Sequence, residues 1–552
     1  MGKNRIFLEN NNGILQGSIT PANSLLILLN KGVFAVMFAA KNERDISIFI
    51  IAIVAILFFH GINLDGLPVG LHSDESSIGI NAAAIAKNGT DEHGNSFPIY
   101  FKAFGEYKNP IYIYMCGLLF KVFGVSAQAL RTTSCLFFVL GFIHCLMLIR
   151  NLFPKNRTVL FFAALNFGFL PVLFVLSRIS FEVISQFTFT AWILYVTWQI
   201  IEYSNNDKKR QLTALALGLL IGLSVYSYST ARLLSALYCF SLAIIFCNRR
   251  DFWLLPTIAL GCLVALIPYG YFAFENSAGL TTRFKELSFI DDDISTLAKL
   301  SHFVHNYGKY FSFEFLLLKG DENLRHAIGY AGEIFFTTFI LAIIGIFTFL
   351  KTHDRQRIFL RLLVINLAFA PFAAALTNGS AHALRGMLGP VYMAYLACYG
   401  FNFLLQHTSK FSLRISKGLL WILSIEVACF LFAYFVVYPG RSLKATEDYD
   451  SLSRLQEAVH RAPDKIYFTG ASYANLRFFL EFIDNPKSIP FEIKGDEVTP
   501  KPNECVVYHD YNKIEERLGT PVYEKKSVYS ANWLQKMIGI EDVPHGVRLR
   551  CY

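Results

Sequence analysis

Two acidic residues stand side by side in the segment LHSDESSIGINAAAIAKNG, where they are Asp74 and Glu75. A carboxylate can act as a general base that removes a proton from an attacking hydroxyl or amine. The same pair can instead stabilise the start of a helix, because negative charge is favourable near a helix N-terminus. The periodicity of the following residues predicts that helix, and Gly89 predicts its end. Both interpretations of the acidic pair remain open at this point.

Arginines that could bind an anion stand alone between long apolar stretches. Three short polar segments, SRISFE, YSYSTAR and TNGSAHALRG, contain Arg178, Glu182, Tyr226, Tyr228, Arg232, His382 and Arg385. Ionisable residues in such surroundings are energetically costly, so they usually face a polar cavity and mark a functional site. Each arginine could instead extend to lipid headgroups. Together with Arg131, the set favours one shared anionic site, and guanidinium groups bind phosphate through two parallel hydrogen bonds.

The elements that must position these residues are membrane helices. Of the 552 residues, 54% are hydrophobic and only 16% are charged, whereas soluble domains carry about 25% charged residues. Apolar runs of about 20 residues, the length that spans a bilayer, recur along the chain. This composition excludes an ordinary soluble enzyme and a disordered chain, and it predicts a polytopic α-helical membrane protein.

Eleven apolar segments are the predicted transmembrane helices. They cover residues 46–64, 129–149, 158–176, 181–201, 212–226, 231–247, 254–274, 333–350, 357–376, 387–405 and 418–438. A further apolar run at 110–123 has 14 residues and contains Lys121, which makes it shorter than the ~17–25 residues needed to cross. We therefore expect it to form a helix along the outer surface.

The positive charge indicates the orientation. Five connections between predicted spans lie on the same side as the N-terminus and together contain thirteen Lys and Arg residues. The positive-inside rule places them in the cytoplasm. The formal net charge of +9 is thus explained largely by topology and does not indicate binding to nucleic acid.

This topology predicts three regions in a multi-pass cell-membrane protein. They are a cytoplasmic N-terminal segment with an interfacial helix (1–45), a transmembrane region with outer loops at 65–128 and 275–332 (46–438), and an extracytoplasmic tail (439–552). The tail has soluble composition and alternating strand and helix patterns, which predict a small α/β domain. Because the outer compartment permits disulfides, Cys505 and Cys551 in this tail could pair.

The order of the polar residues carries a resemblance. Asp74 and Glu75 are followed by a predicted helix, a Lys-x-Pro turn that begins at Lys108, a short helix that ends in Phe-Gly, and Arg131. This order resembles the first outer loop of GT-C glycosyltransferases, in the family-39-like group of protein O-mannosyltransferases and lipid A aminoarabinose transferases. The segments SRISFE, YGKYFSFEFLLLKGDENLRHAIGYAGEI and TNGSAHALRGMLGPVYMAYLACYG resemble later motifs of that group.

The resemblance implies a GT-C fold and a function. Such enzymes transfer a sugar from a polyprenyl-phosphate donor to an envelope glycan, lipid or protein on the outer face, and family behaviour suggests inversion. By this resemblance Asp74 is the general base and Glu75 supports it. The candidates for the donor phosphate are Lys108, Arg131, Arg325 and Arg385. The candidates for sugar contacts or structural partners are Arg178, Glu182, Tyr226, Tyr228, Arg232, His326 and His382.

The sequence departs from the family at one position that concerns metals. Many members have Glu immediately before the Lys-Pro turn, whereas this chain has Tyr107 there and Glu106 one residue earlier. His302 and His305 have helical i, i+3 spacing, although loop histidines are more often polar surface. We therefore assign no certain cofactor, leave a divalent metal open, and name Glu106, His302 and His305 as weak candidate ligands.

Two other classes of protein compete with the transferase. A transporter or flippase of lipid-linked saccharides would also have many spans and intramembrane charges, but it should place charges at mid-membrane. Here the charges gather at the outer ends of the helices. A non-catalytic membrane subunit would be favoured if substitution of Asp74 and Lys108 had no effect. The prediction is therefore a glycosyltransferase, with the transporter as the alternative.

Overall fold

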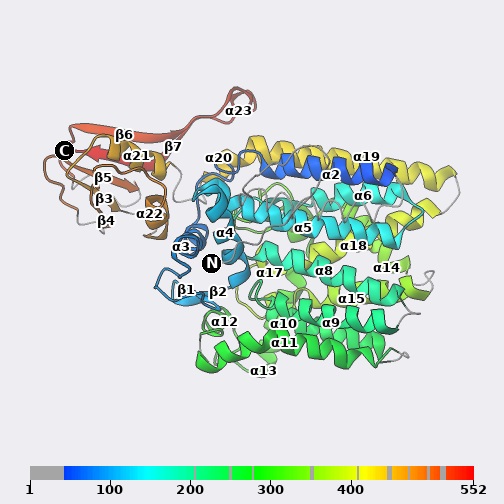
Figure 1. Cartoon of the computed structure of the whole chain (residues 1–552). Helices are drawn as coiled ribbons and strands as arrows, with labels where there is room; N and C mark the ends of the chain where they lie inside the picture. Colours follow the sequence, from blue (N-terminus) through cyan, green and yellow to red (C-terminus); the bar gives the residue numbers. More distant parts are fainter. Residues whose placement is uncertain are drawn as a thin grey trace, which may run out of the picture. The chain divides into compact units, whose positions relative to one another are not determined.

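Figure 1 shows the computed structural model of the chain. It describes residues 43–203, 207–247, 251–276, 279–348, 354–406, 410–443, 450–469, 473–493, 498–509 and 518–552. Residues 47–552 form one unit and residues 1–46 another. The predicted interfacial helix in the N-terminal segment 1–45 lies outside the described residues.

Every segment predicted to span a membrane lies on helix, and these helices pack side by side (Figure 1). They are α2 (Glu43–Gly61), α5 (Ala127–Leu152), α6 (Arg157–Gly168) with α7 (Pro171–Leu176), α8 (Val183–Glu202), α9 (Asp207–Ser224), α10 (Ala231–Phe246), α11 (Leu254–Glu275), α14 (Phe336–Phe347), α15 (Asp354–Phe369) with α16 (Phe372–Ala375), α18 (Leu388–Gln406) and α19 (Lys410–Phe432). Pro171 separates α6 from α7, because proline has no N–H to continue a helix.

Five helical segments are long and apolar enough to cross a membrane by length and composition. They are Ala127–Leu152, Leu254–Glu275, Arg355–Ala375, Leu388–Gln406 and Ser412–Ser442. Several other apolar helices are shorter, among them those at Asp45–Gly61, Arg157–Gly168 and Ala231–Phe246. The chain is thus a helical membrane protein, while the number of eleven crossing helices stays a prediction.

Glycines allow two helix pairs to approach closely. A side chain at Gly218 of α9 would meet the backbone of α11 at Ile258, and one at Gly345 of α14 would meet the backbone of α18 at Leu396. Small residues at such crossings bring helix backbones together, which is how membrane helices gain packing energy without a hydrophobic driving force between them.

The connections sort into two sets that lie at opposite ends of the helices. Contacts among the predicted outer segments include Glu75–Ser180, Asn109–Glu182, Arg232–Leu280, Ser288–Thr377, Asp321–Ala383 and Asn475–Leu71. Contacts among the predicted inner segments include Asn156–Asn402, Leu152–Gln356 and Arg210–Asp251. The structure thus supports the same grouping that charge parity predicts, and the membrane face that each end meets stays a prediction.

The first outer loop contains two helices and a hairpin. They are α3 (Ser73–Asn88), β1 (Phe101–Ala103), β2 (Glu106–Lys108) and α4 (Pro110–Phe123). β1 and β2 are antiparallel, with Phe101 opposite Lys108. α4 has the bounds predicted for the short surface helix and packs against both α3 and α5. Gly89 ends α3 in a left-handed conformation (φ 71°) that glycine adopts without strain.

The second outer loop and the segment before α18 supply further short elements. They are α12 (Thr282–Leu287), α13 (Thr296–Lys309), the π-helix η1 (Glu314–Leu318) and α17 (Ala383–Gly386). Asn306 of α13 donates to the carbonyl of Thr377 at 3.0 Å. The second outer loop is therefore attached to the segment that leads into α17.

The C-terminal region contains a five-stranded mixed sheet, as the alternating pattern predicts. Its elements are η3 (Ala433–Val437), α20 (Tyr438–Ser442), α21 (Ser451–His460), β3 (Lys465–Thr469), α22 (Tyr473–Leu480), β4 (Phe491–Ile493), β5 (Glu504–His509), β6 (Tyr523–Tyr529), α23 (Trp533–Met537) and β7 (Val543–Cys551). The strand order is β4-β3-β5-β7-β6, with β3 parallel to β4 and β5. Cys505 and Cys551 are paired opposite each other on β5 and β7 and form a disulfide. The domain boundary at residue 439 stays a prediction.

Helix α22 of this region packs against α3. Arg477 forms an ion pair with Glu92 at 2.6 Å, and Asn475 faces the carbonyl of Leu71 at 3.5 Å. Gly79 of α3 lies directly against the ring of Phe478. The sheet domain thus contacts the helix that begins with the acidic pair.

This contact generates a prediction about stability. A leucine at Gly79 would overlap the Phe478 ring, and overpacking of this kind costs about 1–3 kcal/mol. We expect Gly79→Leu to lower the thermal unfolding midpoint and to speed cleavage of the C-terminal region by added protease. Gly418→Leu is the control, because a side chain there meets nothing within 4 Å. Equal behaviour of the two variants would contradict the described packing.

Candidate active site

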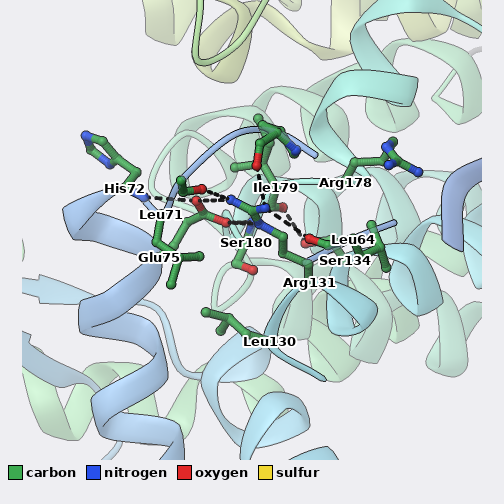
Figure 2. A network of polar contacts seen from close by, with 12 residues as sticks. Leu64, Leu71, His72, Glu75, Leu130, Arg131, Ser134, Arg178, Ile179 and Ser180 are labelled. Atoms are coloured by element: carbon green, nitrogen blue, oxygen red, sulfur yellow. Dashed lines mark hydrogen bonds and ion pairs between the residues drawn. The ribbon is translucent and has the colours of Figure 1, made fainter. Parts of the chain in front are cut away.

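A buried ion pair joins α3 to α5 at the start of the first outer loop (Figure 2). Arg131 donates to both carboxylate oxygens of Glu75, at 2.9 and 3.0 Å. The same carboxylate accepts hydrogen bonds from the backbone N–H of Ser180 at 3.0 Å and of His72 at 3.1 Å. Burial opposes the charge of Glu75, but Arg131 and these hydrogen bonds outweigh it and lower the pKa of Glu75.

The remaining N–H groups of Arg131 hold the chain between α2 and α3. They donate to the carbonyl oxygens of Leu64, Pro68 and Gly70. All five N–H donors of this guanidinium are thereby occupied, and the side chain is 1% exposed. The sequence predicts that Arg131 binds phosphate. In the structure its role is structural, because no N–H group of the guanidinium is left to bind a phosphate. Glu75 likewise supports the site and does not face it.

Arg178 is a second saturated arginine. Its guanidinium donates to the carbonyl oxygens of Phe59, His60, Ile62 and Leu67 and to the hydroxyl of Tyr434. Arg178 is fully buried. The sequence predicts a substrate contact for it, and the structure instead shows a side chain that fixes the end of α2.

Asp74 faces the candidate site as the neighbour of Glu75. Its carboxylate accepts a hydrogen bond from the Lys108 ammonium at 2.9 Å and lies 3.3 Å from the His72 ring. Burial opposes ionisation of Asp74, but Lys108 and then His72 outweigh it and hold the pKa of Asp74 well below its usual range. Burial also opposes the charge of Lys108, and Asp74, Glu182 and Glu106 outweigh it and raise the pKa of Lys108. The carboxylate and the ammonium are therefore both charged.

Glu182 at the start of α8 fixes the turn that carries Lys108. Its carboxylate accepts from the backbone N–H of Asn109 at 2.7 Å and from the Asn109 side chain at 2.8 Å. Arg232 donates to the carbonyl of Leu280 at 2.7 Å and approaches Asn109 Oδ1 at 3.4 Å. Glu182 and Arg232 thus border the Lys108 turn from two different helices.

Burial raises the pKa of the Tyr228 hydroxyl, Arg385 opposes that rise, and Glu182 and Asp74 add to it. Arg385 itself donates to the Thr377 hydroxyl at 2.9 Å.

Other candidates lie elsewhere. Tyr226 donates to the carbonyl of Ala265 at 2.9 Å and accepts from the N–H of Tyr269 at 2.8 Å, so both capacities of its hydroxyl are used within the protein. His302 and His305 are exposed on α13. Arg325 is half-buried in the second outer loop, next to His326.

Among the described residues, Asp321, His326 and His382 form a group whose geometry could hold a metal ion. The sequence indicates His326 and His382 as sugar contacts and does not indicate Asp321 at all. Glu106, His302 and His305 are not part of this group. The three weak metal candidates of the sequence are thus not brought together by the described structure.

A small cavity lies inside the helix bundle, and its lining on α8 starts at Gln186, one helical turn beyond Glu182. Gln186, Thr190 and Ile193 line it from one face of α8, because residues three and four apart share a face. The rest of the lining comes from α9, α10, α15 and α18 and is largely apolar. The residues that line the cavity are uncharged.

Two side chains of the candidate sites are missed by reading the sequence. Asn109 stands directly after Lys108, and its amide bonds to Glu182 could have been suspected only from that adjacency. Asp321 lies five residues before His326 in KGDENLRH, a spacing that no regular element brings together. An acidic residue beside a histidine in an outer loop was the available signal.

A family model supports the resemblance. Residues 107–271 match the family described as dolichyl-phosphate-mannose-protein mannosyltransferase. The match begins beside Lys108 and ends in α11, so it includes Glu182, Tyr228 and Arg232. No curated protein sequence matches the chain.

Two solved structures of ArnT show the fold. The chain is similar to ArnT from Cupriavidus metallidurans bound to undecaprenyl phosphate, with a TM-score of 0.58 and 12% identity, over 91% of this chain and 97% of that one. The apo state of the same ArnT gives a TM-score of 0.52 at 11% identity, over the same shares. An oligosaccharyltransferase from Archaeoglobus fulgidus matches at a TM-score of 0.45 and 13% identity, over 80% and 63% of the two chains.

The site and these comparisons agree with one another. The chain has a carboxylate paired with a lysine at one end of a helix bundle, the fold of ArnT and a segment that matches a mannosyltransferase family. The predicted resemblance to GT-C glycosyltransferases is thus confirmed, in the fold of the whole chain and in the sequence of residues 107–271.

The Asp74–Lys108 pair predicts a difference in lysine reactivity. Lys108 is 7% exposed and ion-paired, whereas Lys102 in the same hairpin is exposed. With an amine-acetylating reagent at mildly alkaline pH, we expect Lys102 to be modified and Lys108 to resist, because its raised pKa keeps it protonated. Asp74→Asn should increase the modification of Lys108. Peptide mass spectrometry measures both sites, and equal labelling of the two lysines would contradict the pairing.

Proposed function

We propose that the chain is a membrane glycosyltransferase that moves a sugar from a polyprenyl-phosphate donor to an acceptor of the cell envelope. The observation that carries this proposal is the Asp74–Lys108 pair, in which a partly exposed carboxylate and a buried ammonium meet at 2.9 Å. A base for the acceptor and a cation for the leaving phosphate are the two groups that such a transfer needs. The likeness to ArnT bound to undecaprenyl phosphate supports this donor class.

The proposed reaction breaks the bond between the sugar C1 and the phosphate oxygen. An acceptor hydroxyl or amine forms the new bond to C1, the electron pair of the broken bond leaves with the lipid phosphate, and Asp74 takes the acceptor's proton. Attack from the side opposite the phosphate would invert C1. Positive charge near the phosphate stabilises the charge that develops as it departs.

Lys108 has the central part in holding the phosphate, and Arg385 and Arg325 are the proposed additional contacts. A phosphate that binds Lys108 competes with Asp74 for the same ammonium. Because Lys108 is the main opposite charge that lowers the pKa of Asp74, donor binding would raise that pKa and make Asp74 a better base. Arg131 has no part in this step, since its five donors are occupied.

The lipid tail of the donor would enter the helix bundle. The apolar composition of the helices supports this path, and the small, largely apolar cavity beside Gln186 of α8 lies in the same bundle. The N-terminus is proposed to be cytoplasmic, and the outer loops and C-terminal domain to be extracytoplasmic, because the basic connections gather at the other end of the helices. The acceptor is an envelope glycan, lipid or protein.

The first test replaces the base. Asp74→Asn should lower transfer by about 10²- to 10⁴-fold, the usual contribution of a general base, while the thermal unfolding midpoint stays close to that of the wild type. The matched control is Asp65→Asn, an exposed aspartate of the same outer loop. Purified protein with labelled undecaprenyl-phosphate sugar and envelope extracts as acceptor provides the assay. Turnover of Asp74→Asn at the wild-type rate would exclude Asp74 as the base. If the wild-type protein carries the donor across the membrane without consuming it, a flippase is favoured.

The second test concerns the phosphate. Lys108→Ala should weaken binding of undecaprenyl phosphate about 10- to 150-fold, because a hydrogen bond to a charged group contributes about 1.5–3 kcal/mol. Lys102→Ala should bind like the wild type. Asp74→Asn should bind at least as tightly, since it releases Lys108. Unchanged affinity of Lys108→Ala would exclude this lysine from the phosphate site.

A further inference from the structure

A second group of chemically capable side chains lies in the outer loops, apart from the Asp74–Lys108 pair. Asp321 and His326 follow η1 in the second outer loop, and His382 precedes α17. One ligand atom from each of the three lies within 4.8 Å of the other two. Asp321 and His326 are buried, and the His382 side chain is 26% exposed, so the group is open to solvent only on the His382 side. The fold thus brings two histidines and a carboxylate together from separate segments.

The distances are close to those of a metal site. Asp321 Oδ2 lies 3.1 Å from His326 Nδ1, with which it shares a hydrogen bond, and 3.6 Å from His382 Nδ1. A tetrahedral Zn²⁺ with bonds of about 2.0–2.2 Å keeps its nitrogen and oxygen ligands about 3.3–3.6 Å apart. The carboxylate oxygen therefore stands at ligand spacing from the His382 ring, and a bound ion would replace its hydrogen bond to His326.

Backbone N–H groups hold the Asp321 carboxylate in place, as the residues around a metal site do for its ligands. Asp321 Oδ1 accepts from the N–H of Asn323 at 2.9 Å, and Oδ2 accepts from the N–H of Ala383 at 2.8 Å. The backbone N–H of Asp321 donates to Glu333 at 3.0 Å. Such hydrogen bonds hold ligating side chains in position and raise metal affinity.

His382 supplies an independent observation. Its Nδ1 atom is buried and has no hydrogen-bond partner within the described residues. Buried polar atoms are nearly always paired, and an unpaired one calls for an explanation such as a bound ion. An imidazole nitrogen with no other partner is available to bind such an ion.

We propose that Asp321, His326 and His382 bind one divalent transition-metal ion, with Zn²⁺ as the favoured ion. Imidazole nitrogen suits zinc and related ions, whereas Mg²⁺ and Ca²⁺ prefer oxygen ligands alone. Three protein ligands leave a fourth position of a tetrahedral site for water or another molecule. This site differs from the one that Glu106, His302 and His305 would make.

The metal would fix two arginines relative to each other. Arg325 immediately precedes the ligand His326, and Arg385 follows the ligand His382 by three residues. One ion would thus join the second outer loop to the segment before α18 and set the separation of Arg325 and Arg385. This consequence rests on the proposed function, in which both arginines contact the donor phosphate. The proposal that the three residues bind a metal is independent of that function.

The test measures metal on the full chain without substrate. Purified protein is stripped with 1,10-phenanthroline and EDTA, dialysed, and exposed to Zn²⁺ alone. We expect one zinc per chain by elemental mass spectrometry and a rise in the thermal unfolding midpoint on zinc addition. Absence of tightly bound zinc together with an unchanged midpoint would overturn the proposal. Because no sugar transfer is measured, failure here is distinguishable from failure of the proposed activity.

Variants assign the ion to these ligands. His382→Ala should weaken zinc binding by at least about tenfold, since even the partners of metal ligands contribute that much. The control is His302→Ala, which removes an exposed histidine of the same outer region. Asp321→Asn, which keeps the shape of the side chain, is the second variant and should weaken zinc in the same way. Wild-type zinc affinity in both His382→Ala and Asp321→Asn would overturn the assignment.

Discussion

The buried ion pair between Glu75 and Arg131 is the constraint on which the outer end of this protein depends. Removing one partner of such a pair usually costs about 3–5 kcal/mol, because the other charge is left buried without compensation. Here the pair joins α3 to α5, and Arg131 also holds the carbonyl oxygens of Leu64, Pro68 and Gly70. The chain that enters α3 therefore has one path, and that path decides where Asp74 lies.

Asp74 and Glu75 show how two adjacent carboxylates acquire different parts. Glu75 points inward to Arg131 and caps α3, while Asp74, on the next position of the same helix turn, points to Lys108. Glu182 fixes the Lys108 turn from the opposite side through Asn109. Glu75 thus fixes the position of the start of α3, and Asp74 is available to act as the base. The two interpretations that the sequence leaves open, helix cap and general base, are divided between the two residues.

The sequence predicts the helices well because membrane helices are apolar over a fixed length, and each predicted span lies on helix. It also selects Asp74 and Lys108, which the fold pairs at 2.9 Å although they stand 34 positions apart, and their part in the chemistry stays a proposal. It cannot tell that Arg131 and Arg178 turn inward, since their partners are backbone carbonyls, which every residue has and whose position depends on the tertiary path. Asp321 is missed for a related reason: its meeting with His382 depends on how two loops pack, and neither loop has a periodic pattern.

The most direct test of this account is a double-mutant cycle on the pair, with unfolding free energies measured for purified protein in detergent. Glu75→Gln and Arg131→Met are compared alone and together. Directly interacting residues show coupling of about 0.5–3 kcal/mol, whereas independent sites add within about 0.5 kcal/mol. The account predicts that each single variant is strongly destabilised and that the double variant loses at least about 1 kcal/mol less than the sum of the two. Additive losses would contradict the claim that this ion pair organises the site.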